Sequence, residues 1–288
     1  MKLKHVIGTA LACGLLLTTA WSCDEDDTVG IEQSNLRLVF EDNFDGPEGA
    51  SINTDVWNFD IGTGQDGWGN LELQYYTDRP ENIALDGNGN LLITARRESF
   101  QGSEFTSARI NTKDKFEQQY GRIEARIQMP GGRGIWPAFW MLGSTIETEA
   151  DDDPNTQPWP FIGEIDVTEL RGQEPSLSIG SIHGPGYSGG GAISGTFELM
   201  EERFDTDYHI FAVEWTADYI DFFIDGVRYN RITTEDLPDG ADWPFDDHPF
   251  FMLLNVAVGG NFVGFPVDGT PFPQSMIVDY VRVYEIIN

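Results

Sequence analysis

The feature of this sequence that most constrains its fold is an alternation of apolar and polar residues with a period of two. In the stretch 121–129 (GRIEARIQM), Ile123, Ala125, Ile127 and Met129 would share one face of a strand, and the polar residues between them the other face. A helix, with a period of 3.6, would scatter the same residues around its surface. The pattern therefore predicts a β-strand that buries one face.

Turn signals separate several more strand-like runs. Asp225-Gly226 lies between the runs 219–224 and 227–232, and an Asp-Gly pair favours a two-residue hairpin turn because both central residues need φ > 0. Many short strands of this kind predict an all-β sandwich of two sheets, with one short helix near 233–237. Strands that are more apolar, or that close the chain, are expected at 91–95, 250–258 and 276–285.

The N-terminus resembles an export signal. Lys2 and Lys4 precede an apolar run at 6–19 that is too short to cross a bilayer, so residues 1–22 are predicted to be a signal peptide. Ala20-Trp21-Ser22-Cys23 resembles a bacterial lipobox, which predicts cleavage before Cys23 and lipidation of that cysteine. Residues 23–35 then form an acidic linker, and 36–288 a single domain. We expect an outer membrane lipoprotein exposed at the cell surface; the alternative is an ordinary secretory signal and a secreted protein.

The charge balance restricts the partners. The chain carries 17 basic and 48 acidic residues, and loss of residues 1–22 removes two lysines, so the net charge falls from −31 to −33. Such a surface repels nucleic acid and disfavours strongly sulfated polymers. Only one cysteine remains after processing, so no intrachain disulfide can form. We expect a monomer that contacts the membrane only through its lipid.

Three acids in the segment 163–169 (GEIDVTE) are the strongest candidates for chemistry. On a regular strand Glu164 and Asp166 face one side and Glu169 the other, and a solvated strand face would need no further explanation. A β-bulge at Val167-Thr168 would return Glu169 to the face of Glu164 and bring the two carboxyl groups to roughly 5–6 Å. Retaining glycosidases need that separation, and coupling between the acids would keep one of them protonated near neutral pH.

The same segment resembles the bulged active-site signature of glycoside hydrolase family 16. The resemblance covers residues 36–288 and implies a β-jelly-roll of two curved antiparallel sheets, with a concave cleft that binds substrate. It implies that Glu164 is the nucleophile, Asp166 its assistant and Glu169 the general acid/base, and that catalysis needs no cofactor. Thr168 departs from the Met common at this position, which leaves the linkage preference open.

Flanking stretches resemble the laminarinase-like branch of that family. In 68–76 (WGNLELQYY) the resemblance places Asn70 and Glu72 near the nucleophile, although Leu71 stands where an Asn is common. In 134–142 (GIWPAFWML) Trp136 and Trp140 share a strand face and could stack on sugar rings; alternatively both are core residues. Further residues that match cleft positions are Arg109, His183, Trp215 and Asn255. A purely structural role stays open for His183, and a simple ion pair for Arg109.

A structural calcium ion is suggested by the resemblance alone. Many family members bind calcium on the convex face, and the matching groups here are the carbonyl oxygens of Glu41 and Gly89 and the carboxylate of Asp279. Ligation by oxygen alone suits Ca²⁺. Asp279 could equally be an ordinary surface acid.

The resemblance predicts an endo-acting enzyme that hydrolyses β-1,3-glucan of the laminarin type, and in addition mixed-linkage β-1,3-1,4-glucan. Three alternatives stay open: the same fold acting on another polysaccharide such as agarose, a noncatalytic glycan-binding lipoprotein, and a transglycosylase. The complete set of acids argues against a noncatalytic protein. The heavy negative charge favours a neutral glucan as substrate.

Overall fold

The computed structural model describes residues 35–146 and 157–287. The predicted signal peptide, the predicted lipidation site Cys23, the predicted linker up to residue 34 and most of the acidic segment 145–160 lie outside these ranges. No helix within them is long and apolar enough to cross a membrane.

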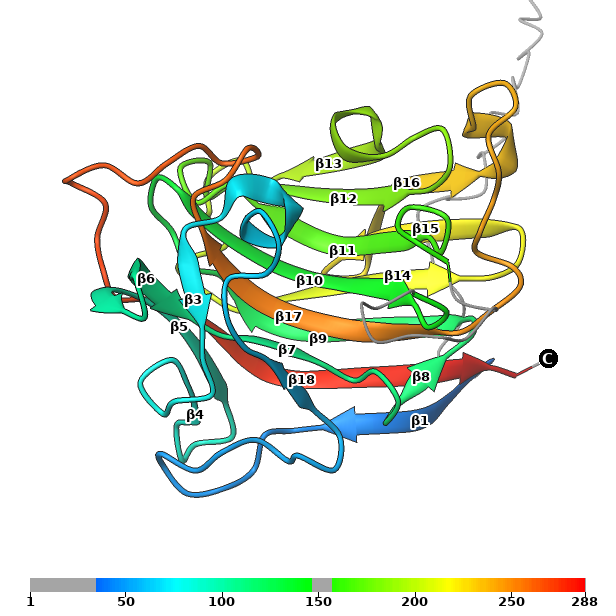
Figure 1. Ribbon diagram of the computed structural model, residues 1–288. Coiled ribbons are helices and arrows are strands. Elements are labelled where there is room, and N and C mark those ends of the chain that lie inside the picture. Colours follow the sequence, from blue (N-terminus) through cyan, green and yellow to red (C-terminus); the bar gives the residue numbers. More distant parts are fainter. Residues whose placement is uncertain (1–34, 147–156, 288) are drawn as a thin grey trace, which may run out of the picture.

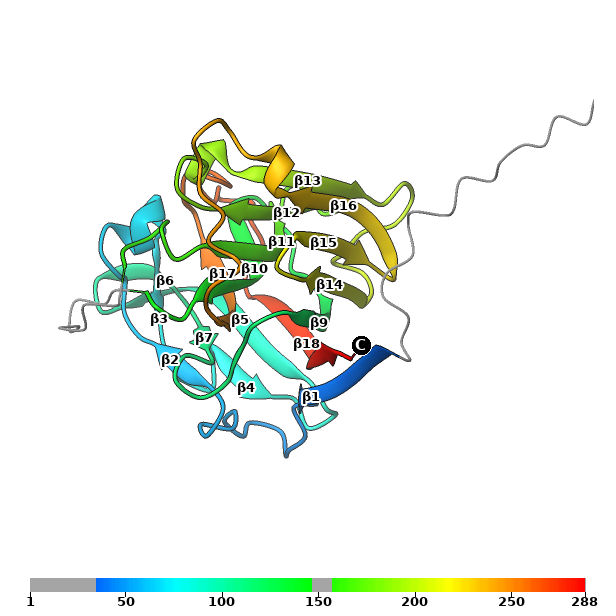
Figure 2. The same ribbon diagram turned by 90° about the vertical axis from the view of Figure 1, so that its right-hand side faces the viewer.

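Two β-sheets pack face to face as a sandwich, visible as two layers in Figure 1 and Figure 2. The ten-stranded sheet runs in the order β16 (Val227–Thr233), β15 (Tyr219–Ile224), β14 (His209–Trp215), β9 (Gly121–Gln128), β18 (Gln274–Ile286), β5 (Leu91–Phe100), β6 (Ser103–Ser107), β3 (Gln74–Tyr76), with β1 (Leu36–Asp42) beside β18 and β4 (Ile83–Leu85) beside β5. The eight-stranded sheet runs β13 (Ile193–Glu198), β12 (Leu177–His183), β11 (Glu164–Leu170), β10 (Ile135–Gly143), β17 (Phe250–Val258), β7 (Arg109–Asn111), β2 (Asn58–Asp60), with β8 (Glu117–Gln118) beside β17.

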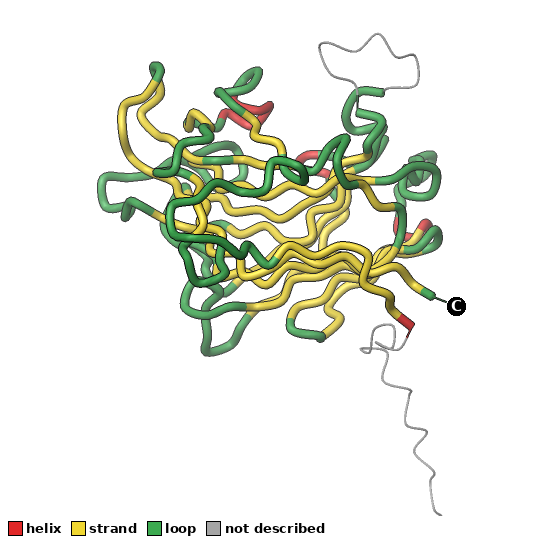
Figure 3. The backbone as a smooth tube through the Cα atoms, turned by 90° about the horizontal axis from the view of Figure 1, so that it is seen from below, coloured by secondary structure: helices red, strands yellow, loops and turns green. Residues whose placement is uncertain are grey.

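This architecture is the predicted all-β jelly-roll sandwich, with one difference. Neighbouring strands pair antiparallel except β3 and β6, which pair parallel. Helices in the described residues are single short turns, and Figure 3 shows them among the loops at the ends of the strands. The predicted short helix near 233–237 is a 3-10 turn over Thr234–Asp236 that a capping box closes.

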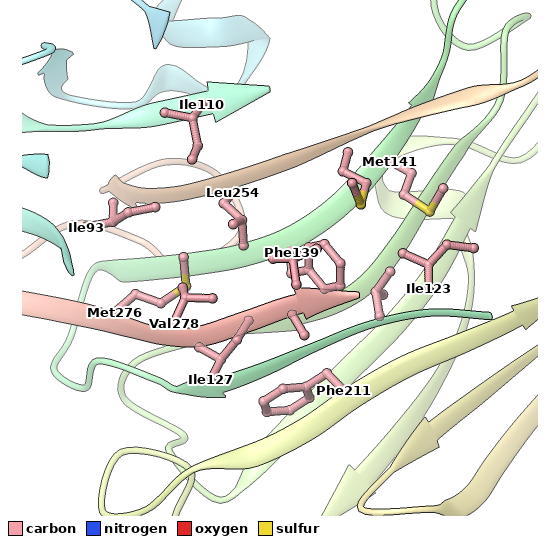
Figure 4. Close-up of a cluster of buried hydrophobic side chains, with 14 of the residues drawn as sticks. Ile93, Ile110, Ile123, Ile127, Phe139, Met141, Phe211, Leu254, Met276 and Val278 are labelled. Atoms are coloured by element: carbon pink, nitrogen blue, oxygen red, sulfur yellow. The ribbon is translucent and has the colours of Figure 1, made fainter. Parts of the chain in front are cut away.

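The core forms where the apolar faces of the two sheets meet. Ile123 and Ile127 of β9 are fully buried against residues of the opposite sheet such as Phe139 and Leu254 (Figure 4). The alternation in 121–129 is thus confirmed as the pattern of a strand with one buried face. Every residue of β17 is buried, as its apolar sequence predicts, because this strand lies at the centre of its sheet.

The Asp225-Gly226 hairpin is also confirmed. Both residues have positive φ, 50° and 80°, as the turn between β15 and β16 requires. The Asp225 carboxylate accepts a hydrogen bond from the backbone N–H of Ile210 at 2.8 Å and contacts Nδ1 of His209 at 2.7 Å, so the turn is tied to β14.

Trp215 corrects one expectation about the cleft. It lies on β14 of the ten-stranded sheet, its side chain is fully buried in the core, and its indole N–H donates to the carbonyl oxygen of Phe245 at 2.9 Å. Its rings pack edge-on against Tyr120 and Phe250. Trp215 is therefore a core residue that substrate cannot reach. Its strand belongs to the ten-stranded sheet, whereas the predicted catalytic acids lie on β11 of the eight-stranded sheet.

Substitution Trp215→Phe should test this assignment. The ring is kept, but the carbonyl of Phe245 loses its donor, so the free energy of unfolding should fall by about 1–3 kcal/mol, the cost of leaving a buried polar group unpaired. Urea denaturation measures this loss. Turnover per folded molecule should stay within about twofold of wild type; a large loss of turnover at unchanged stability would return Trp215 to the cleft.

Candidate active site

The eight-stranded sheet gathers most of the predicted site residues. Figure 1 shows β12, β11, β10 and β17 lying side by side, with β7 next in the sheet. Each of these strands carries at least one of the predicted residues: His183, the three acids, Trp136 and Trp140, Asn255, and Arg109 in that order.

A β-bulge interrupts β11 at the predicted position. Asp166 pairs with Trp140 of β10, whereas the preceding residue of β10, Phe139, pairs with Thr168. Two residues of β11 therefore oppose one step of β10, and Val167 is the extra residue. The pairing with β12 shifts between Asp166 and Glu169 as well.

The bulge changes which way the following side chains point. Val167 and Leu170 both enter the core although they lie three residues apart, which an unbroken alternation would not allow. Glu169 is thereby turned out of the core and onto the same face as Glu164 and Asp166, close enough for their charges to interact.

Burial of this carboxyl cluster raises the pKa of each member. Burial, with the Asp166 charge adding to it, raises the pKa of Glu169 to about 8. Burial raises the pKa of Asp166 to about 7, although its hydrogen bond with Glu164 acts in the opposite direction. The pKa of Glu164 is also raised well above its usual value by burial and by Asp166. Three buried like charges cannot all be ionised, so the cluster retains protons near neutral pH and titrates as a unit.

Nε2 of His183 lies close to this cluster. Its Nδ1 accepts a hydrogen bond from the backbone N–H of Gly189 at 3.0 Å, so the ring proton of the neutral imidazole must reside on Nε2. Nε2 lies 3.0 Å from Oδ2 of Asp166 and 3.7 Å from Oε1 of Glu164. His183 thus faces the acids of the neighbouring strand, but it lies beside Asp166 and Glu164, whereas the resemblance implies a place beside the general acid/base Glu169.

Two indole N–H groups hold the two outer acids. Trp136 donates to Oε1 of Glu169 at 2.9 Å, and Trp159 donates to Oε2 of Glu164 at 2.9 Å. Trp136 is a residue that the sequence predicted for the site, whereas Trp159 is not. The available signal was an aromatic residue five positions before the first acid, next to an acidic, proline-rich stretch.

Arg109 lies between two aromatic rings. Its guanidinium carbon is 4.4 Å from the ring centroid of Trp68 and 4.8 Å from that of Trp140, and its Nε pairs with Oδ2 of Asp60 at 2.8 Å. Arg109 therefore forms the ion pair that was one expectation and also lies beside Trp140 on the face that carries the acids, which was the other. The half-buried ring of Trp140 shares its surface with this guanidinium.

A directed chain of hydrogen bonds links Trp140 to Glu72. The Trp140 N–H donates to Oδ1 of Asn255 at 2.7 Å, and Nδ2 of Asn255 donates to the Tyr76 hydroxyl at 3.2 Å. The hydroxyl in turn donates to Oε2 of Glu72 at 3.2 Å, and Asn70 donates to Oε1 at 3.3 Å. Because indole can only donate, Asn255 must accept through Oδ1 and donate through Nδ2, and the Tyr76 hydroxyl then donates to Glu72, whose pKa burial raises. Asn255 is buried, so it acts through this chain.

The predicted calcium ligands receive no support. Oδ2 of Asp279 pairs with Nη1 of Arg126 at 2.6 Å, and the side chain of Glu41 lies 3.6 Å from Nε of Arg282. A cation would have to share the Asp279 carboxylate with a guanidinium, whereas these side-chain contacts do not test the predicted carbonyl ligands of Glu41 and Gly89. Calcium stays a prediction from resemblance.

Among the described residues, one group of acids and histidine converges closely enough to hold a metal, namely Glu164, Asp166 and His183, with ligand atoms within 4.8 Å of one another. His183 presents a proton on Nε2 there, where a metal ligand needs a lone pair. The group fits proton chemistry better than metal chemistry. Two carboxyl groups on one face, in different surroundings, can act as nucleophile and acid.

Comparison with known proteins places the chain in a family. The sequence profile of Glycosyl hydrolases family 16 matches residues 71–262. The chain is 41% identical over 298 residues to a Beta-glucanase of Rhodothermus marinus, covering 99% of this chain and 96% of that protein. The laminarinase catalytic domain of Thermotoga maritima superposes with a TM-score of 0.79 at 44% identity, covering 88% of this chain and 100% of that one. The laminarinase of Rhodothermus marinus gives a TM-score of 0.77 at 40% identity, covering 88% and 98%. This chain belongs to glycoside hydrolase family 16.

Proposed function

We propose that the protein is a retaining endo-β-1,3-glucanase of the laminarinase type, with mixed-linkage β-1,3-1,4-glucan as a second substrate. The observation that carries this proposal is the bulge in β11, which turns Glu164 and Glu169 to one face and gives them different partners. The similarity to a Beta-glucanase and to two laminarinases supports the substrate class.

The surroundings of the two glutamates support separate roles. Glu169, whose pKa of about 8 keeps it protonated at neutral pH, gives its proton to the leaving oxygen while Glu164 attacks the anomeric carbon. Water then attacks the glycosyl-enzyme, Glu169 takes its proton, and Glu164 is released. Asp166 shares a hydrogen bond with Glu164 and can hold the proton that Glu164 must lose before it attacks.

The site face suits a neutral polysaccharide. Trp136 and Trp140 lie half-buried on β10 with part of each ring accessible for stacking against sugar C–H groups. Arg109 is paired with Asp60 and Arg171 with Glu174 at 3.3 Å, so the guanidinium groups around the acids are already engaged. A sulfated galactan would need free cations here, which supports a neutral glucan over carrageenan-like polymers.

Product analysis with purified protein should test the substrate. We expect oligosaccharides of several lengths from laminarin, weaker release from lichenan, and none from agarose or carrageenan. Chromatography of early products also separates endo from exo action. Strong activity on agarose or carrageenan with none on laminarin would overturn the glucanase assignment and leave the roles of the acids intact.

Substitution Glu169→Gln should separate the two steps. Turnover of polymer should be nearly abolished, because the leaving oxygen goes unprotonated, while an activated aryl β-glycoside should still glycosylate the enzyme. Added azide should then release a β-glycosyl azide, detectable by NMR. Glu164→Gln is the matched control and should give no azide product, since an amide is a poor nucleophile. A glycosyl azide of the α configuration from the Glu169→Gln variant would exclude the retaining mechanism.

Substitution Trp136→Phe should move the alkaline limb of kcat/KM. The indole N–H favours ionised Glu169 and so lowers its pKa; without the bond that pKa rises, and the protonated acid persists to higher pH. The apparent pKa of this alkaline limb should increase by about one pH unit, since a hydrogen bond to a charged group is worth about 1.5 kcal/mol. A limb that stays in place or moves to lower pH would contradict this role.

For location we propose a lipid anchor at Cys23, from the lipobox-like sequence alone. Cys23→Ser should give a soluble protein of unchanged specific activity, measured after membrane fractionation. Membrane association equal to wild type would refute the anchor.

A further inference from the structure

Trp159 is a large aromatic side chain held in a solvent-exposed position. Its relative exposure is 43%, whereas such side chains are usually well buried. Its indole N–H is nevertheless directed to Oε2 of half-buried Glu164 at 2.9 Å, and its ring centroid lies 6.0 Å from that of the His183 imidazole. The position of Trp159 is thus explained by its contacts with the site rather than by the core.

The turn that carries Trp159 is anchored to the sheet. Ile162 is buried beside β10, and its carbonyl oxygen faces Nε2 of His248 at 2.8 Å. Gly163 has φ +71°, and a Cβ there would lie 2.9 Å from the ring of Phe250, so only glycine fits directly before β11. Its N–H closes the turn onto the carbonyl of Pro160 at 3.1 Å. These contacts fix the indole relative to the start of β11.

The indole differs from the two acids around Glu164. Asp166 and Glu169 oppose a charge on Glu164, whereas His183 and the Trp159 hydrogen bond favour it. An indole N–H only donates and does not titrate in water, so it favours the carboxylate at every working pH. It also engages one oxygen, Oε2, while Oε1 lies 3.7 Å from Nε2 of His183.

We propose that Trp159 is a positioning residue for the nucleophile: it holds Oε2 of Glu164 so that the ionised carboxylate presents Oε1 to the anomeric carbon. The inference rests on the proposed glycosidase function. When Oε1 bonds to the anomeric carbon and the glycosidic bond breaks, the proton of Glu169 passes to the leaving oxygen, and Oε2 becomes the ester carbonyl, still accepting from the indole. When water attacks, the bond between Oε1 and the anomeric carbon breaks, and the same N–H stabilises the departing carboxylate.

Trp159→Phe tests the proposal because it keeps an aromatic ring and removes the N–H. The substrate is an activated aryl β-glycoside, for which hydrolysis of the glycosyl-enzyme limits kcat. We expect kcat to fall about tenfold, the value of one hydrogen bond to a charged group. We also expect the acid limb of kcat/KM to move to higher pH, because loss of the donor raises the pKa of Glu164. Replacement by benzothienylalanine, which has sulfur in place of N–H, should reproduce both effects with the ring shape kept.

Phe161→Ala is the matched control, since Phe161 is an exposed aromatic residue in the same turn. It should leave kcat and the acid limb unchanged. The proposal is overturned if Trp159→Phe and the benzothienyl variant keep the wild-type limb and kcat, or if Phe161→Ala shifts the limb equally. A wild-type enzyme inactive on every glycoside tested would instead refute the proposed function.

Discussion

The site depends on one irregularity in one strand. β11 must bury Ile165, Val167 and Leu170 while presenting Glu164 and Glu169 on its other face, and a strand with regular alternation cannot do both. The extra residue at the bulge satisfies both demands. The surrounding strands make the bulge tolerable: β10 and β12 pair normally on either side of it, and the Thr168 hydroxyl bonds to that of Ser178 at 2.8 Å within the buried region.

Indole donors hold the two glutamates of the site. Trp136 donates to Glu169 and Trp159 to Glu164, while Nε2 of His183 lies 3.0 Å from Oδ2 of Asp166. A cation in direct contact would hold the pKa of Glu169 low and remove the acid at neutral pH. The two indoles fix one oxygen of each glutamate without adding a charge, and burial, with the Asp166 charge, raises the pKa of Glu169 to about 8, as general acid catalysis requires.

Local patterns predicted much of this molecule, since they report on one strand at a time. Alternation in 121–129 and the Asp225-Gly226 turn were readable from spacing, and the bulge in β11 was expected from the resemblance of the segment 163–169 to a bulged active-site signature. Contacts between distant segments were not. The burial of Trp215 depends on which sheet β14 joins, and Trp159 reaches Glu164 only because a turn outside any strand is anchored by Ile162. The contacts of Arg109 could not be predicted for the same reason, because its partners Asp60 and Trp68 lie more than 40 positions away in the sequence.

The central claim is that the bulge makes Glu164 the nucleophile opposite Glu169. Trapping with a 2-deoxy-2-fluoro glycoside that carries an activated leaving group tests it most directly, because the fluorine slows hydrolysis of the glycosyl-enzyme and lets it accumulate. After proteolysis, mass spectrometry should find one sugar per chain, attached to Glu164. Label on Glu169, or full turnover of the natural substrate with inversion and no label at all, would contradict the account.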